Sequence, residues 1–422
     1  MTRPLQDDCF AHDPRRMPAA EALALLRARI GPVVGHETVP LAHAHGRILA
    51  EAVVSLRDNP GFDNVAVDGF AFAHGDLAPG GPTRLRLAPG RAAAGHPWDG
   101  HLPRGSALRV LTGASLPEGA DTALMQEDVE VAGAQVVIPP GVRRGANCRR
   151  AGEDIRRGQL VLEPGRRLRP QDIGLAANAG RGTLEVRTPL RVALLSSGDE
   201  LCEPGRPLPP GGTYDVNRVM LAGLLAALGC EVSDLGILPD RPEVVEAALA
   251  GAARDHHALL TSGGASRGDE DHLVHAVARL GRLHFWQIAV KPGRPLAFGQ
   301  LGDAVFVGLP GNPVAARVCC LRFARPVLCA LAGAAWPEPR AFPLPAGFAM
   351  RKKAGRREYL RARLEPGADG RPRALRIERE GSGILTSLTE AQGLVEVPEE
   401  VTRIEEGDPV DFVPFSELGI PP

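Results

Sequence analysis

The sequence contains little that would bind nucleic acid. Aromatic residues make up only 4% of its 422 residues, so the chain has few side chains on which bases could stack. Its 49 basic and 50 acidic residues give a formal net charge of −1, so no excess of positive charge attracts phosphate backbones or anionic lipids. Composition therefore excludes a nucleic-acid-binding protein and gives no reason to expect a membrane-surface protein.

The sequence also lacks a long uninterrupted hydrophobic run. The longest apolar stretch, residues 314–336, carries Arg317, Arg322 and Arg325, and therefore predicts an amphipathic helix rather than a membrane span. The polar, acidic N-terminus does not resemble a signal peptide. None of the seven cysteines forms a CxxC pair, which favours reduced thiols. We therefore expect a cytoplasmic protein without membrane segments.

Lysine is scarce, because almost all basic residues are arginines. The lysines are Lys291, Lys352 and Lys353. A preference for arginine codons explains this bias without any functional cause, but it draws attention to each lysine that is retained. The 44% hydrophobic content is ordinary for globular proteins, and about 100–200 residues per domain predicts two to four domains.

Patterns along the chain predict a multi-domain fold of the α/β plus β class. Residues 190–336 alternate apolar strands with helices, which is typical of a doubly wound α/β domain with a mainly parallel sheet. Frequent turn signals before and after this segment predict β-rich structure. We expect four domains: an elongated N-terminal linker domain (17–58 plus 152–188), an inserted β-rich domain (59–151), the α/β domain (189–336) and a C-terminal β-barrel-like domain (337–422).

Helix signals are clearest at five places. Helical spacing of apolar residues predicts a helix over 17–30, and residues 40–56 read as a helix or a helix–strand piece. Flanking Pro and Gly predict a helix over 170–179. The next helix is predicted over 217–228 with Asn217 as its N-cap, and one long helix is predicted over 313–334.

Three predicted strands end in loops of small residues. Strands 191–195, 257–261 and 305–308 are followed by SSGDE, SGGASRGDED and LPGNP. Ligands of open α/β sheets bind at the carboxyl ends of strands, and small residues let backbone N–H groups approach an anion. The NP pair also fits an ordinary capped helix. The chain has neither a GxxxxGK[ST] nor a GxGxxG motif, so any nucleotide must be held by a different set of loops.

Charged residues gather in the same region. The acids that lie near the predicted carboxyl ends of strands, or in the loops that follow, are Asp199, Glu200, Asp215, Asp240 and Asp271. Clustered carboxylates near phosphate-binding loops suit Mg²⁺, although each acid alone also fits a helix N-terminus. Lys291 and Arg294 place two permanent cations beside one chain reversal, which suits an oxyanion or an ordinary surface turn. The residues alone thus predict an α/β domain that binds a phosphorylated ligand with Mg²⁺.

Eight sequence strings go further. They occur in the order PGFDNVAVDGFA, LTGASLPEGAD, RRAGEDI, SSGDEL, YDVNR, TSGGASRGDEDH, KPGRP and GLPGNPV. Together they resemble the molybdopterin molybdenumtransferase family, which is MoeA-type and similar to the gephyrin E domain. The resemblance covers about residues 17–420. It implies that molybdate is transferred to the dithiolene of adenylyl-molybdopterin, with Mg²⁺-dependent release of AMP.

The resemblance also implies an assembly and a set of site residues. It implies a homodimer whose cleft lies between the α/β domain of one subunit and the β-rich insert of the other, and a molybdopterin adenylyltransferase as a partner. The implied metal ligands are Asp240 and Asp271. The implied catalytic residues are Asp68, Asp154, Glu200, Lys291 and Arg294. The implied substrate-binding residues are Thr112, Ser262, Gly263, Gly264, Pro310, Gly311, Asn312, Arg361 and Ser382.

Two other functions remain to be weighed. A molybdopterin adenylyltransferase shares the α/β domain, but such enzymes usually consist of that domain alone. A non-catalytic molybdopterin-binding scaffold would be expected to lose cleft acids, whereas Asp68, Asp154 and Glu200 are all present. The transferase is therefore the favoured hypothesis.

Overall fold

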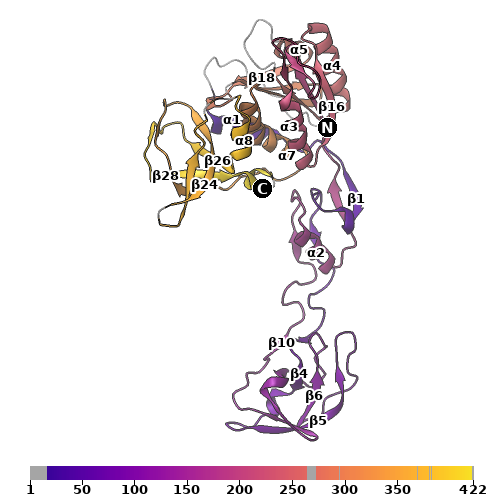
Figure 1. The fold of residues 1–422 in the computed structure, drawn as a ribbon. Coiled ribbons are helices and arrows are strands. Elements are labelled where there is room, and N and C mark those ends of the chain that lie inside the picture. The colour runs from indigo at the N-terminus through magenta and orange to yellow at the C-terminus, as the bar shows by residue number, and fades with distance from the viewer. Residues whose placement is uncertain are drawn as a thin grey trace.

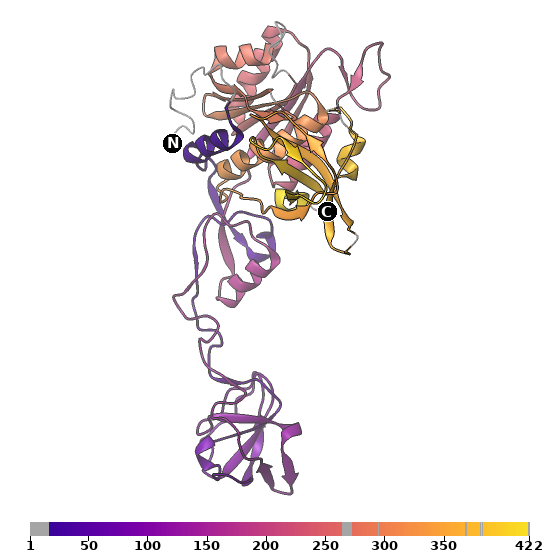
Figure 2. The same cartoon turned by 90° about the vertical axis from the view of Figure 1, so that its left-hand side faces the viewer.

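The chain forms an elongated molecule with a large body at one end and a small β domain at the other (Figures 1 and 2). The computed structural model describes residues 17–263, 272–293, 295–367, 369–379, 381 and 383–420. Among these residues, no helix is both long and apolar enough to cross a membrane. The body holds the α/β and C-terminal parts, and a slender middle region connects it to the distal domain.

A six-stranded sheet forms the centre of the body, in the order β16-β13-β17-β21-β20-β18. The strands are β13 (Arg191–Ser197), β16 (Glu231–Leu238), β17 (Ala258–Ser262), β18 (Arg282–Gln287), β20 (Pro295–Leu301) and β21 (Ala304–Leu309). The first four in the order pair in parallel, whereas β20 pairs antiparallel with both β21 and β18, so that β20 runs opposite to the other five strands. The prediction of a mainly parallel sheet therefore holds for only part of it. Only two residues join β20 to β21, and so short a connection permits only an antiparallel hairpin.

Helices cover both faces of this sheet. They are α3 (Val216–Ala227), α4 (Pro242–Asp255), α5 (His272–Leu280), α6 (Pro313–Cys319) and α7 (Arg325–Leu331). Alternate strand residues point to opposite faces, so one set packs against α3, α6 and α7 and the other against α4 and α5. The long helix predicted over 313–334 is interrupted by a π-helical turn at Cys320–Ala324. Helix α1 (Ala19–Arg29) packs against α7, although the sequence grouped it with the linker domain.

The middle region is built from paired segments of two distant stretches of chain. Strand β1 (His36–Pro40) pairs with β12 (Thr183–Arg187), and β2 (Val53–Val54) pairs with β11 (Leu160–Leu162). Helix α2 (Pro170–Asn178) confirms the helix predicted over 170–179. Residues 40–56 form only a short 3-10 turn, Leu41–His43, before β2, so the helical part of that prediction is wrong.

The distal domain is a six-stranded sheet in the order β7-β4-β6-β5-β9-β8. Its strands are β4 (Gly69–Phe72), β5 (Thr83–Ala92), β6 (Ser106–Val110), β7 (Thr122–Met125), β8 (Glu130–Ala132) and β9 (Gln135–Ile138). A pair of short strands, β3 (Asn64–Val65) and β10 (Cys148–Arg149), lies beside it, with 3-10 turns at His74–Asp76 and Gln126–Asp128. Two apolar clusters, one on each side, give this domain a core of its own.

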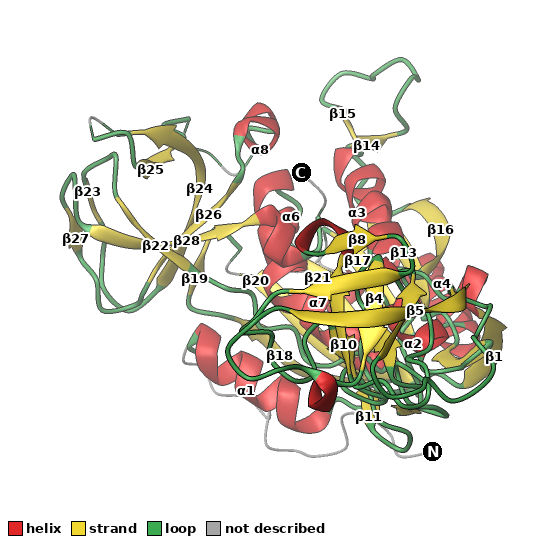
Figure 3. Ribbon diagram, turned by 90° about the horizontal axis from the view of Figure 1, so that it is seen from below, coloured by secondary structure: helices red, strands yellow, loops and turns green. Residues whose placement is uncertain are grey.

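The C-terminal sheet stands beside the α/β part (Figure 3), in the order β19-β24-β26-β28-β22, with β25 paired to β24. Its strands are β19 (Val290–Lys291), β22 (Phe342–Pro345), β24 (Arg357–Pro366), β25 (Pro372–Arg376), β26 (Gly393–Val397) and β28 (Pro409–Pro414). Smaller elements are β23 (Met350–Arg351), β27 (Arg403–Ile404), α8 (Thr386–Glu390) and the 3-10 turn Phe415–Leu418. A bridge between Ala346 and Ala374 links the β22 side to β25, so the strands curl around an apolar core.

Candidate active site

A cavity of about 1030 Å³ lies between the carboxyl ends of the central strands and the C-terminal sheet. The two parts share one apolar core, which fixes this cavity between them. Many of the residues predicted from the sequence line it, although they come from five separate segments. They are Glu200, Ser262, Gly263, Lys291, Pro310, Gly311, Asn312 and Arg361. The loops that follow β13, β17 and β21 thus meet at one site, as expected for an open α/β sheet.

The predicted metal ligands are only partly placed. Asp240 does not line the cavity; its carboxylate accepts from Ser197 Oγ at 3.4 Å, and its backbone N–H donates to Asp199 Oδ1 at 3.2 Å. Asp271 lies outside the described residues. Within the described part of the chain, no group of three or more acidic, histidine or cysteine side chains is arranged to hold a metal ion. The described residues alone therefore do not make up a Mg²⁺ site.

Lys291 brings a cation to the opposite wall. Strand β19 leaves the α/β part and pairs with β24, with Lys291 opposite Glu358. The Lys291 Nζ lies 3.7 Å from the carboxylate of Glu358, which is only 2% exposed and also pairs with Arg356 at 2.8 Å. Since the lysine side chain is itself 52% exposed, its charge faces the cavity while a buried acid limits its movement. Arg294, predicted to act with it, lies outside the described residues.

Arg361 holds a loop of the same wall. Its guanidinium donates to the carbonyl oxygens of Gly381 and Arg379, at 3.3 and 3.0 Å, and to Ser387 Oγ. Burial lowers the pKa of Arg361, and the nearby charge of Arg376 lowers it further. Arg376 also lines the cavity, although no local pattern in the sequence pointed to it. Two arginines thus lie close together on this wall. Gly264 and Ser382, two predicted substrate contacts, lie outside the described residues.

The remaining predicted residues lie far from this cavity within the same chain. Asp68 accepts hydrogen bonds from the Thr112 backbone N–H and Oγ1, both at 2.7 Å, and these bonds hold the pKa of its carboxyl below the usual value. Both residues belong to the distal domain, at the opposite end of the molecule (Figure 1). Asp154 accepts from Asn59 Nδ2 at 2.8 Å, where the chain returns to the middle region. A single chain does not bring these three residues to the cavity.

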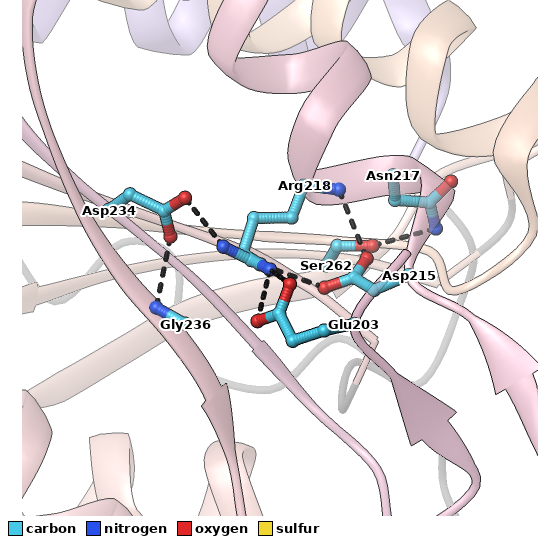
Figure 4. Close-up of polar contacts among 7 residues, drawn as sticks. All are labelled: Glu203, Asp215, Asn217, Arg218, Asp234, Gly236 and Ser262. Carbon is cyan, nitrogen blue, oxygen red and sulfur yellow. Dashed lines mark hydrogen bonds and ion pairs between the residues drawn. The ribbon is translucent and has the colours of Figure 1, made fainter. Parts of the chain in front are cut away.

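The start of helix α3 connects the loops around the cavity (Figure 4). Asp215, not Asn217, caps the helix, since its carboxylate accepts from the Arg218 backbone N–H at 3.1 Å. The N-cap prediction for Asn217 was therefore wrong. Asn217 lies in the first turn and bonds to Ser262 at the end of β17 and to Gly311 in the loop after β21. Asp215, Asn217 and Arg218 belong to the string YDVNR, in which no signal pointed to a role of Asn217 or Arg218 in the site.

Arg218 is surrounded by carboxylates. Its guanidinium bonds to Asp215 at 3.0 Å, to Asp234 at 2.5 Å and to Glu203 at 2.5 Å. Burial alone would lower the pKa of Arg218, but the three carboxylates outweigh it and raise the pKa above its ordinary value. Glu203 belongs to the loop between β14 (Leu201–Cys202) and β15 (Thr213–Tyr214). Since Leu208 of this loop lines the cavity, the cluster ties a cavity loop to the helix.

Comparisons with known proteins agree along most of the chain. The MoeA N-terminal region (domains I and II) matches residues 17–180, a probable molybdopterin-binding domain matches 193–330, and the MoeA C-terminal region (domain IV) matches 343–415. A molybdopterin molybdenumtransferase of Haemophilus influenzae is 36% identical over 384 residues, which are 90% of this chain and 94% of the relative. The chain belongs to the MoeA family. The resemblance inferred from the eight strings is thereby confirmed.

Other MoeA-family members are similar in sequence and in fold. Molybdopterin molybdenumtransferase 2 of Mycobacterium tuberculosis is 34% identical over 383 residues, covering 88% of this chain and 93% of the relative. The crystal structure of the molybdopterin biosynthesis moeA protein from Pyrococcus horikoshii OT3 superposes with a TM-score of 0.83 at 29% identity, covering 95% of this chain and 100% of that chain. The multi-domain architecture is thus that of the MoeA fold.

Proposed function

We propose that this MoeA-family chain transfers molybdate to the dithiolene of adenylyl-molybdopterin and releases AMP. The observation that carries the proposal is the make-up of one cavity. Glycine- and serine-containing loops at the strand ends form one wall, and Lys291, Arg361 and Arg376 lie on the other. The first wall suits the phosphates of an adenylate, and the second suits an oxyanion. The named relatives are molybdopterin molybdenumtransferases, which supports the same reaction.

The reaction requires mainly that the protein positions the two substrates and neutralises their negative charge. Molybdenum–sulfur bonds form on the two sulfurs of the substrate, so no protein thiol is needed. Molybdate loses one oxygen when the sulfurs bind, and this oxygen leaves as water with the two thiol protons. Cleavage of the phosphoanhydride consumes one water, so the overall reaction balances. Lys291 would neutralise charge on the oxyanion, and Glu358 would hold the lysine in place. Glu200 lines the cavity and would accept a proton or a hydrogen bond from the substrate on the nucleotide side. Magnesium dependence remains a prediction.

A second part of the proposal concerns assembly. Asp68, Thr112 and Asp154 are family positions that one chain leaves far from its own cavity. We propose a homodimer in which the distal domain of each subunit supplies these residues to the cavity of the other. Asp68→Asn and Glu200→Gln subunits would each be inactive, but a mixed population would contain dimers with one intact site. Recovery of activity on mixing and reassembly supports a shared site, and no recovery in a proven mixed dimer contradicts it.

The reaction itself is tested by AMP release. Purified protein is mixed with adenylyl-molybdopterin and Mg²⁺, with or without molybdate, and AMP is measured by chromatography. We expect molybdate-dependent release that Lys291→Met reduces by at least about tenfold, since one charge-assisted contact is worth about 1.5–3 kcal/mol. Lys353→Met is the matched control, because Lys353 does not line the cavity. Tight binding without AMP release would indicate a scaffold. Consumption of ATP in a separate incubation with molybdopterin and ATP would indicate an adenylyltransferase.

A further inference from the structure

Asn217 has an unusual arrangement at the base of the cavity. Its side chain lines the cavity, although the residue is only 6% exposed. The amide nitrogen Nδ2 lies 2.8 Å from Ser262 Oγ (Figure 4) and also 2.5 Å from the carbonyl oxygen of Gly311. A carbonyl oxygen can only accept a hydrogen bond, so the atom facing Gly311 must be the nitrogen. The orientation of the amide is therefore fixed by its neighbours.

This orientation leaves the other amide atom without a partner. Asn217 Oδ1 is buried and makes no hydrogen bond within the described part of the chain. Arg218, the adjacent cation, is already bonded to three carboxylates through Nε and both terminal nitrogens. Buried polar atoms are nearly always hydrogen-bonded, and an exception in a binding cavity points to a group supplied from outside the chain.

The chemistry of the atom restricts that group. An amide oxygen accepts hydrogen bonds and donates none, so it requires a donor. Ionised phosphate and molybdate oxygens also only accept, and would be repelled rather than held. Asn217 also lies beside the loops of Ser262 and Gly311, and not on the wall of Lys291. The donor must therefore belong to an uncharged part of the ligand that lies near those loops.

We propose that Asn217 Oδ1 accepts a hydrogen bond from the nucleoside part of the adenylylated ligand, either from a ribose hydroxyl or from the adenine amine. This assignment rests on the proposed function, because it assumes an adenylate in the cavity. It gives Asn217 two roles in one amide. The nitrogen joins the end of β17 to the loop after β21. The oxygen selects for a nucleoside that carries a hydrogen-bond donor within its reach.

The test is binding of AMP and three analogues to the full-length chain, measured by titration calorimetry. The analogues are 2′-deoxy-AMP, 3′-deoxy-AMP and inosine monophosphate, each of which lacks one candidate donor. Wild-type protein should bind one of them about tenfold more weakly than AMP, as expected for one lost hydrogen bond. Asn217→Ala should bind AMP itself about tenfold more weakly and should no longer distinguish that analogue from AMP.

A matched variant separates the two roles of the amide. Ser262→Ala removes one partner of Nδ2 but leaves Oδ1 and its Gly311 anchor in place. It should therefore bind more weakly overall and still distinguish the analogue. The inference is overturned if wild-type protein binds AMP and all three analogues equally, a result that needs no variant to fold. It is also overturned if folded Asn217→Ala discriminates as wild type does. Failure of the wild type to bind AMP at all would instead contradict the proposed function.

Discussion

Replacement of Arg218 by methionine should destabilise the α/β part of the chain by about 3–5 kcal/mol, the usual cost of removing one partner from a buried ion pair. The Arg218 side chain is 7% exposed and that of Asp215 is 2% exposed, so Asp215 would be left buried without its charged partner. Asp215 keeps the backbone N–H of residue 218, which places the expected loss near the lower end of this range. Methionine retains most of the aliphatic packing, so the loss reports mainly on charge.

The same cluster contains a solvent-exposed ion pair for comparison. Glu203 is 51% exposed, so its pair with Arg218 is screened by water, and Glu203→Gln should cost less than about 1 kcal/mol. Asp234→Asn is the matched control, because it removes a similarly exposed acid from the same guanidinium, and Asp234 does not belong to the cavity loop. Raising the salt concentration should therefore increase amide exchange in residues 203–212 of the wild type. Glu203→Gln should show that increase already at low salt.

Urea unfolding followed by circular dichroism, with hydrogen exchange to locate the loss, measures these differences. The expected order is a large effect for Arg218→Met and small effects for Glu203→Gln and Asp234→Asn. Only Glu203→Gln should loosen the cavity loop. If Arg218→Met unfolds within about 1 kcal/mol of the wild type, a buried, charge-balanced cluster is the wrong description. Equal costs for Arg218→Met and Glu203→Gln would contradict the assigned exposures.

Two further predictions concern Gly293, which follows Lys291 in the cavity wall, and the distal domain. Gly293→Ala should abolish most activity, because a Cβ at this position would lie 2.2 Å from Cys319 Sγ and the backbone φ is +105°. The control for backbone strain alone is Gly302→Ala, since Gly302 is also left-handed but has open space around it. Activity equal in both would contradict tight packing under the loop. Thr112→Val should raise the pKa of Asp68 towards its ordinary value, seen by NMR titration of the carboxyl carbon. Since the folded pKa of Asp68 is lowered, its stabilising contribution is present above the unfolded pKa and is lost as pH falls through the folded pKa. Valine removes the hydroxyl bond but keeps the backbone N–H bond, which is the larger cause of the lowered pKa, so the variant should lose part of this pH dependence. An unchanged titration would contradict the assigned hydroxyl bond.

The sequence predicted the α/β part well for a physical reason. Continuous apolar runs followed by small-residue loops are typical of buried strands that end at a binding edge. It did not predict β20, the one strand of the six that runs opposite to the others, because apolar runs look alike in parallel and antiparallel strands. The available signal was the two-residue connection at 302–303, which contains a glycine with φ +60° and forces a hairpin.

The site was predicted less completely than the fold. Loop residues with a recognisable motif, such as Ser262 and Gly311, line the cavity as expected. The role of Asn217 was missed because Asn at a helix start fits an N-cap equally well, and only the structure shows which acid caps the helix. Glu358 and Arg376 gave no local signal, since their place in the site depends on the C-terminal sheet packing against the α/β part.

The molybdenum content of the pterin product tests the proposed function most directly. Adenylyl-molybdopterin, Mg²⁺ and molybdate are incubated with the protein, the pterin is isolated, and its bound molybdenum is measured by mass spectrometry beside the AMP released. Molybdate transfer predicts equal amounts of pterin-bound molybdenum and AMP, both lost in Glu200→Gln and Lys291→Met. Release of AMP in full yield with no molybdenum on the pterin would show a hydrolase instead, and would contradict the proposal.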